Sequence, residues 1–190
     1  LFVTLGVHAQ QGDRELFNEA ERRFQSLDYE LAIDRYDTLI RQYPVSQHIP
    51  DAQFHKAVAL YRLGRPEEAL ELLNQVERRY RSTRYLGYVP FWRGVIHFDQ
   101  GRPEQALAEL SAFVDSYQAR GEGGAALDPE LLNQAFLYKA LAEIDVGESD
   151  AAMRSLGTLL ADEESPADEP YALSLLLSLQ VQAGEFSAAR

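Results

Sequence analysis

The heptapeptide GRPEEAL at 64–70 returns almost unchanged as GRPEQAL at 101–107, 37 residues further along the chain. The alanine of this motif occurs five times in series, at Ala32, Ala69, Ala106, Ala152 and Ala189. The steps between these alanines are 37, 37, 46 and 37 residues. A period of roughly 20 to 50 residues is typical of a solenoid, in which each unit buries its apolar face by stacking on its neighbours.

Aromatic residues keep the same period at independent positions. They form three columns: Phe17, Phe54 and Phe91; Phe24, Tyr61 and Phe98; and Tyr43, Tyr80 and Tyr117. Three columns in one register indicate that the first three copies share one local structure, since each aromatic position must meet the same kind of environment.

Each unit contains two helical patterns with a turn between them. In the first unit, apolar residues recur at steps of three and four, first at Phe17, Ala20, Phe24 and Leu27 and then from Tyr29 to Tyr43. In later units a glycine separates the two patterns, and it can end a helix in the left-handed conformation. These glycines are Gly64, Gly101, Gly147 and Gly184. Pro66 and Pro103 suit the first turn of the next helix, so each unit is expected to be a helix-turn-helix.

Small residues occur where the two helices of a unit must approach closely. On the first helices these are Ala20, Ala57, Gly94 and Ala140, and on the second helices they are the alanines of the repeated motif. The predicted fold is therefore all-α, an α-α superhelix of about five helix-turn-helix repeats, the last one incomplete. The expected repeats are 13–49, 50–86, 87–132, 133–169 and 170–190, with a loop at 118–130 for the nine extra residues of the third step.

Residues 1–12 precede the repeats and have a different character. The segment LFVTLGVHAQ is an apolar run with small residues, Val7 and Ala9, at the two positions that a signal peptidase inspects. This pattern predicts a signal-peptide-like segment with cleavage after Ala9, an exported protein, and a mature chain without a membrane span. The alternative is a membrane anchor or a packing segment. Gln10 stands where a lipoprotein signal would place a cysteine.

Composition excludes several classes of function. The chain has 30 acidic and 18 basic residues, a net charge of -12, which argues against binding nucleic acid. It has no cysteine, so thiol nucleophiles and cysteine-bound metals are absent. The four histidines, His8, His48, His55 and His97, lack the spacing of a metal site, and no set of nucleophile, base and orienting group stands out. We therefore expect no enzyme activity, no cofactor and no metal.

The segment QYPVSQHIPDAQFHKAVALYRLGRPEEALELL at 42–73 resembles the tetratricopeptide repeat (TPR). The resemblance extends from Asp13 to Arg190 and is strongest in the first three copies. The 37-residue step and the Tyr43-Pro44 ending resemble exported bacterial members, of the outer-membrane assembly lipoprotein and Tol-associated division coordinator type. This resemblance implies a location in the periplasm or cell envelope, with the cytoplasm as the alternative.

In the TPR family the first helices line a concave surface, so the resemblance implies that first-helix residues bind the partner. Phe17, Glu21, His55, Tyr88 and Trp92 match the positions of a cationic clamp in the family's chaperone-tail receptors, but none supplies a permanent cation. The predicted groove is aromatic instead. Its candidate contacts are Phe54, Val58, Tyr61, Arg62, Tyr88, Phe91, Trp92, Val95, Phe98 and Asp99.

The predicted function is a non-catalytic scaffold that holds a protein or peptide in this groove. Three alternatives stay open at this point. The aromatic residues could be core between repeats, the repeats could be the docking arm of a larger enzyme, or the incomplete C-terminal repeat could mediate self-association.

Overall fold

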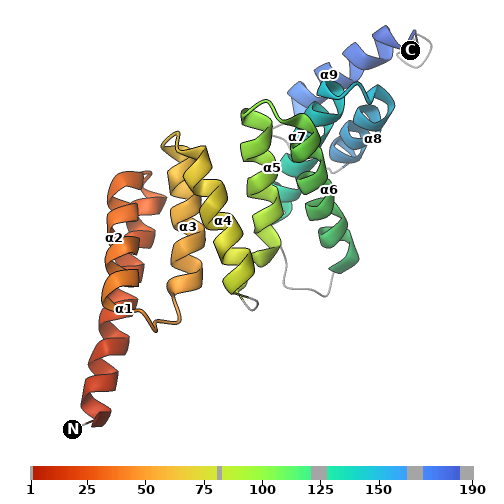
Figure 1. The fold of residues 1–190 in the computed structure, drawn as a ribbon. Helices are drawn as coiled ribbons and strands as arrows, with labels where there is room; N and C mark the ends of the chain where they lie inside the picture. Colours follow the sequence, from red (N-terminus) through yellow and green to blue (C-terminus); the bar gives the residue numbers. More distant parts are fainter. Residues whose placement is uncertain (1, 81–82, 121–127, 162–168, 185–190) are drawn as a thin grey trace. The chain divides into compact units, whose positions relative to one another are not determined.

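The computed structural model describes residues 2–80, 83–120, 128–161 and 169–184, and within them the chain is helical without a strand. The α-helices, in chain order, are α1 (Phe2–Gln25), α2 (Tyr29–Gln42), α3 (Ile49–Arg62), α4 (Pro66–Arg79), α5 (Val89–Asp99), α6 (Pro103–Arg120), α7 (Pro129–Asp145), α8 (Ser149–Leu160) and α9 (Glu169–Gln182). A short 3₁₀ helix, η1 (Leu86–Tyr88), precedes α5. The all-α prediction is confirmed (Figure 1).

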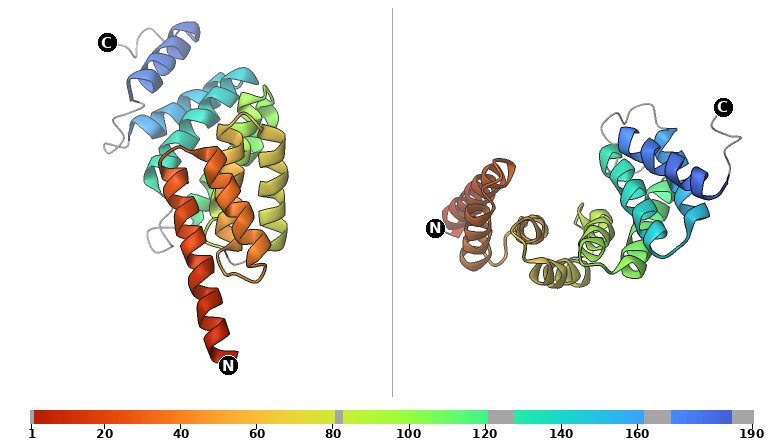
Figure 2. Two further views of the ribbon diagram at one scale, coloured as in Figure 1. Left: turned by 90° about the vertical axis from the view of Figure 1, so that its left-hand side faces the viewer. Right: turned by 90° about the horizontal axis from the view of Figure 1, so that it is seen from above.

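The chain divides into two compact units, residues 1–89 and 90–190. In the first unit α1 packs on α2, α2 on α3 and α3 on α4 (Figure 2). In the second unit α6 packs on α7, α7 on α8 and α8 on α9. Packing of each helix mainly on its sequence neighbours is the pattern of a solenoid, as the repeat period predicts.

The turns inside the repeats adopt the left-handed backbone conformation. Gly64, Gly101, Gly147 and Gly184 have φ values of 73°, 68°, 84° and 76°. Leu27 occupies the corresponding place in the first repeat, 37 residues before Gly64, and has a φ of 61°. Its side chain is 69% exposed. The prediction that Leu27 belongs to the apolar face of the first helix is therefore wrong, because that helix has already ended at Gln25.

The repeated small residues lie where two helices meet. Ala32, Ala69, Ala106 and Ala152 are completely buried. At Gly94 on α5, an added Cβ would lie 2.6 Å from Cγ of Leu110 on α6. The first aromatic column is also core, because Phe17, Phe54 and Phe91 are all buried. The small residues thus set the spacing of the helices, and the first aromatic column fills the core beside them.

One predicted boundary differs from the structure, and the signal-peptide-like segment 1–12 stays a prediction. Helix α1 begins at Phe2 and runs without a break through the predicted signal-like segment into the first repeat. Helix α6 continues to Arg120, so 118–120 are helical and the predicted loop at 118–130 is shorter at its start. Asp128 then caps α7, its carboxylate accepting a hydrogen bond of 3.0 Å from the backbone N–H of Glu130. Ala189 and most of the acidic run 162–169 lie outside the described residues.

Candidate functional site

Five aromatic side chains of the first unit gather at its first helices, α1 and α3, and at the segment that follows α4. We define the aromatic cluster as Phe24 of α1, Phe54 and His55 of α3, Tyr85, and Tyr88 of η1. Phe24 stacks on His55 with ring centroids 5.2 Å apart, and Phe54 stacks on Tyr85 at 4.7 Å. His55 also meets Tyr85 edge to face at 4.7 Å. Since Phe24, His55, Tyr85 and Tyr88 are only partly buried, the cluster presents ring surface to solvent.

The segment that carries Tyr85 is held against the start of α3 by Asp51. The hydroxyl of Thr83 donates a hydrogen bond of 3.0 Å to the Asp51 carboxylate, and the guanidinium of Arg84 lies 3.5 Å from the same side chain. Arg84 also lies over the Tyr85 ring, 4.8 Å from its centroid. These contacts fix where the chain returns to α3, so Tyr85 lies beside both Phe54 and His55.

A carboxylate lies beneath the cluster. Glu21 Oε1 accepts a hydrogen bond of 2.6 Å from the Tyr36 hydroxyl and lies 2.6 Å from His55 Nδ1. The side chains of His55 and Glu21 are only 13% and 19% exposed. Burial alone would raise the pKa of the Glu21 carboxyl, but the contacts with His55 and Tyr36 outweigh it and lower that pKa. Burial, followed by the hydrogen bond to Glu21, raises the pKa of Tyr36.

The predicted contacts of the first unit divide into core and surface. Phe54 and Val58 are buried. Tyr61 is partly exposed and Arg62 is exposed, with the Arg62 guanidinium 5.7 Å from the centroid of the Tyr61 ring. Tyr88 is partly buried and belongs to the cluster, with ring centroids 6.1 Å from Tyr85. Three of the predicted contacts therefore keep side-chain surface that a partner can touch, namely Tyr61, Arg62 and Tyr88.

The second unit shows the same division. Phe91 and Val95 are buried, as expected of residues between helices. Trp92 is partly buried against Phe91, and Phe98 packs edge to face on Tyr138 with centroids 5.6 Å apart. Asp99 is exposed. The predicted site thus falls in two separate units, and a single groove through all ten residues stays a prediction.

Sequence reasoning did not include Tyr85, Phe24 or Glu21 among the partner contacts. Tyr85 lies at the end of the predicted second repeat, in the segment between α4 and η1, where helical periodicity carries no information. Glu21 and His55 had been matched separately to clamp positions, but their pairing joins residues 34 apart. The signal available was that both lie on the first helices of neighbouring repeats, at a separation only three residues short of the 37-residue step.

Within the described part of the chain, no group of three or more His, Asp or Glu side chains is placed to hold a metal ion. His48 stacks on Phe17 with ring centroids 4.7 Å apart, and His55 stacks on Phe24. Both imidazoles therefore have a packing role. The helices in the described ranges also include none that is long and apolar enough to cross a membrane.

Stacked helix pairs that recur mostly at 37 residues, with glycine at four of the turns and a buried alanine near the start of the second helices, define a tetratricopeptide-repeat protein. A family model described as "YfiO: Outer membrane lipoprotein" matches residues 9–136, about two thirds of the chain. The chain belongs to this family. A comparison with curated protein sequences finds no match.

Solved structures support the fold. MamA from Desulfovibrio magneticus RS-1 (residues 41 to the end) is similar with a TM-score of 0.70 and 16% identity, covering 93% of this chain and 88% of that one. A tetratricopeptide repeat protein from Parabacteroides merdae has a TM-score of 0.69 and 15% identity, covering 92% and 62%. YrrB, described as a TPR protein with an unusual peptide-binding site, has a TM-score of 0.64 and 14% identity, covering 90% and 77%. At such identities the similarity shows the fold.

Proposed function

We propose that the protein is a non-catalytic scaffold of the bacterial cell envelope that holds a peptide or protein segment against the aromatic cluster. The observation that carries this proposal is the set of partly exposed rings of Phe24, His55, Tyr85 and Tyr88, fixed by contacts from three separate elements. Aromatic side chains that are already ordered lose little conformational entropy when a partner binds. They also dominate the energetics of many protein interfaces.

The chemistry of the cluster favours an apolar or aromatic segment with acidic or neutral flanks. The rings supply apolar area, and Arg84 places a guanidinium beside Tyr85. The unusual peptide-binding site for which YrrB is described is a precedent for peptide recognition on this fold. The family name supports a location at the envelope, and the proposed compartment is the periplasm.

The proposal is tested by crosslinking in the native host from a photoreactive residue at Tyr88, followed by identification of the captured protein. Tyr88→Ala should then weaken binding of that protein by about fivefold or more if Tyr88 is a major contact. Tyr171→Ala is the control, because Tyr171 is an exposed tyrosine of α9 in the other unit. Equal loss for both variants, or no loss for Tyr88→Ala, would count against the aromatic cluster.

Two measurements address location and assembly. N-terminal sequencing of native material should find Gln10 as the first residue in a periplasmic fraction, as cleavage after Ala9 predicts. Recovery in the cytoplasm would overturn the envelope location. Light scattering of the purified chain separates a monomeric scaffold from self-association through the C-terminal repeat.

A further inference from the structure

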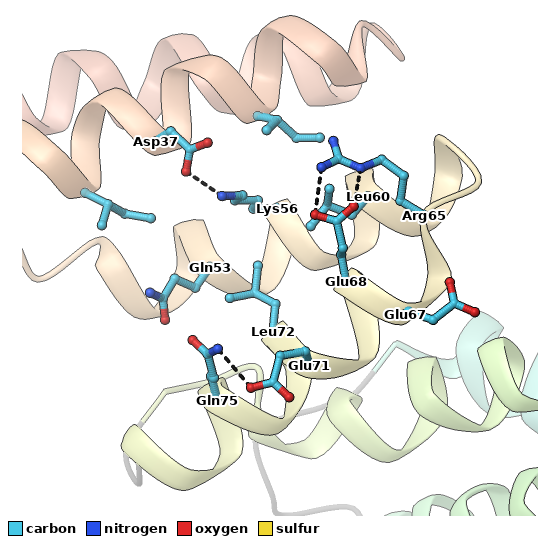
Figure 3. A pocket seen from close by; sticks show the side chains of 12 residues that line it. Asp37, Gln53, Lys56, Leu60, Arg65, Glu67, Glu68, Glu71, Leu72 and Gln75 are labelled. Carbon is cyan, nitrogen blue, oxygen red and sulfur yellow. Dashed lines mark hydrogen bonds and ion pairs between the residues drawn. The ribbon is translucent and has the colours of Figure 1, made fainter.

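A surface of the first unit that is separate from the aromatic cluster lies on the side of the second helices, and it is concave. It has a volume of about 600 Å³ and is lined by α2, α3, and α4 with its preceding turn (Figure 3). Its apolar part comprises Ile33 and Ile40 of α2, Leu60 of α3 and Leu72 of α4. We call it the α2–α4 groove. Its volume is within the range of known ligand pockets, so it can take one or two large side chains of a partner.

The groove and the aromatic cluster use different faces of α3. Successive residues of an α-helix are rotated by about 100°, so His55 lies about 200° around the axis from Gln53. Leu60, seven residues after Gln53, returns to within about 20° of it. Gln53 and Leu60 accordingly line the groove, whereas His55 belongs to the cluster.

The rim of the groove is acidic. Its lining includes the carboxylates of Asp37, Glu67, Glu68 and Glu71 against two cations, Lys56 and Arg65, which gives a net charge of -2. Both cations are already paired inside the groove. Lys56 Nζ donates to Asp37 at 2.5 Å, and Arg65 donates two hydrogen bonds to Glu68 at 2.6 and 2.7 Å (Figure 3). From outside the lining, the Arg78 guanidinium lies 3.5 Å from Glu71 Oε1, and Gln75 of the lining donates to the same oxygen at 3.1 Å. Within the lining itself, carboxylates outnumber cations by two.

The wall of the groove also contains a hydrogen-bond acceptor without a donor. Gln53 is only 8% exposed, and among the residues that the structure describes its side-chain oxygen Oε1 has no hydrogen-bond partner. A buried amide oxygen left unpaired destabilises the folded protein, and a ligand that donates a hydrogen bond to it recovers part of that loss. The groove thus combines an apolar floor, an excess of carboxylates and an unused acceptor.

We propose that the α2–α4 groove binds a basic amphipathic segment of a partner protein. An apolar side chain of the segment packs on the isoleucine and leucine floor, and flanking Lys or Arg side chains meet the carboxylates. An N–H group of the segment donates to Gln53 Oε1 once the amide turns toward the groove, because this oxygen has almost no exposed surface in the unbound chain. This inference goes beyond the proposed function, because the groove and the aromatic cluster share no residue.

The test uses the purified chain and a short fluorescent peptide that combines leucines with lysines. Fluorescence anisotropy should detect binding that weakens as salt is added, since the contacts with the rim are partly exposed. The same peptide with every Lys replaced by Glu should not bind. The peptide with every Leu replaced by Ser should bind much more weakly, because charge alone leaves the floor empty.

Two variants of α4 separate the groove from general attraction to an acidic protein. Glu71→Arg reverses a charge in the lining and should weaken binding of the leucine–lysine peptide about tenfold. Glu77→Arg makes the same change at an exposed position of α4 outside the lining, and should change affinity less than about twofold. Equal effects of the two variants would overturn the proposal.

Gln53→Leu tests the buried acceptor. Removing the unpaired amide should leave the melting temperature unchanged or raise it, and should weaken peptide binding about threefold or more. A folded Gln53→Leu protein with unchanged affinity would remove Gln53 from the site.

Peptide binding regardless of lysine or leucine content would overturn the proposal. So would a dimer that dissociates in Glu71→Arg, because the occupant would then be a second copy of the chain. None of these variants alters the aromatic cluster, so the two proposals fail separately.

Discussion

Glu21 of α1 and His55 of α3 meet at 2.6 Å between Oε1 and Nδ1, although 34 residues separate them in sequence. The contact joins the first helices of two successive repeats directly. Tyr36 of α2 donates to the same carboxylate oxygen, so three helices converge on one atom. This junction supports the partly exposed rings of His55 and Phe24 from below, and it gives the first unit a specific dependence on pH.

The pH dependence follows from the lowered pKa of Glu21. A carboxyl group with a lowered pKa in the folded state contributes stability above its ordinary value of 4.5, and this contribution is lost as the pH falls through the lowered pKa. Glu21→Gln should cost about 1 to 3 kcal/mol at neutral pH, through the loss of hydrogen bonds to a charged group. It should also flatten the decrease in stability below about pH 4.5.

Thermal unfolding from neutral to acidic pH measures both effects of Glu21→Gln. Glu15→Gln is the matched control, because Glu15 is an exposed carboxylate of the same helix. Parallel curves for wild type and Glu21→Gln at acidic pH would show that the pKa of Glu21 is not lowered by folding.

Replacing Leu27 with glycine is predicted to increase the stability of the protein. It has a left-handed φ of 61° and an exposed side chain, at the position where later repeats use glycine. Leu27→Gly should raise the free energy of unfolding by about 1 kcal/mol, because the left-handed conformation is unfavourable for a residue with a Cβ. Gly64→Ala should lower it by a similar amount at the equivalent turn. Urea denaturation measures both, and a less stable Leu27→Gly protein would contradict the explanation.

Two helical glycines should respond in opposite directions to alanine. At Gly94 the new methyl group would meet the side chain of Leu110, so Gly94→Ala should destabilise the protein by about 1 to 3 kcal/mol through overpacking. At Gly157 on α8 an added Cβ would meet nothing within 4 Å among the described residues beyond its chain neighbours and the backbone of its own helix, so Gly157→Ala should stabilise the protein by about 0.5 to 1 kcal/mol. A stabilising effect of Gly94→Ala in urea denaturation would contradict the close approach of α5 and α6, and a destabilising effect of Gly157→Ala would contradict the open space at that position.

Alanine substitutions at Phe91 and Arg62 distinguish residues that pack in the core from residues that lie on the surface of the predicted groove. Phe91 is 1% exposed and packs on Phe113 with ring centroids 5.4 Å apart. Phe91→Ala should cost about 3 to 5 kcal/mol of stability. Arg62→Ala should change stability by less than about 0.5 kcal/mol, since Arg62 is exposed. A small effect of Phe91→Ala in chemical denaturation would restore Phe91 as a surface residue.

The helix pairs could be predicted from sequence because glycine and alanine mark each repeat by a local rule. Gly64 and Gly101 end helices wherever they occur at that step, and Ala69 and Ala106 follow them at a fixed distance. Leu27 shows the limit of this reasoning. It continues the apolar step from Phe24, and only the end of the helix at Gln25 removes it from the core.

The candidate sites were less predictable because they depend on which face of a helix is covered. Phe54 and His55 are neighbours in sequence, yet Phe54 is buried while His55 keeps an exposed edge. Gln53 Oε1 is unpaired because α2 and α4 place no donor beside it. The spacing of residues along one helix does not reveal what the facing helices supply. Periodicity identifies the buried side of a repeat but does not distinguish core from binding surface.

Helix α3 supplies residues both to the aromatic cluster and to the α2–α4 groove. A ligand that restricts the motion of this helix from one side would leave the second ligand less conformational entropy to remove. Occupancy of the two surfaces is therefore expected to be positively cooperative and reciprocal, each ligand raising the affinity for the other by the same factor. A 14-residue helix would in this way connect two partners that never touch each other.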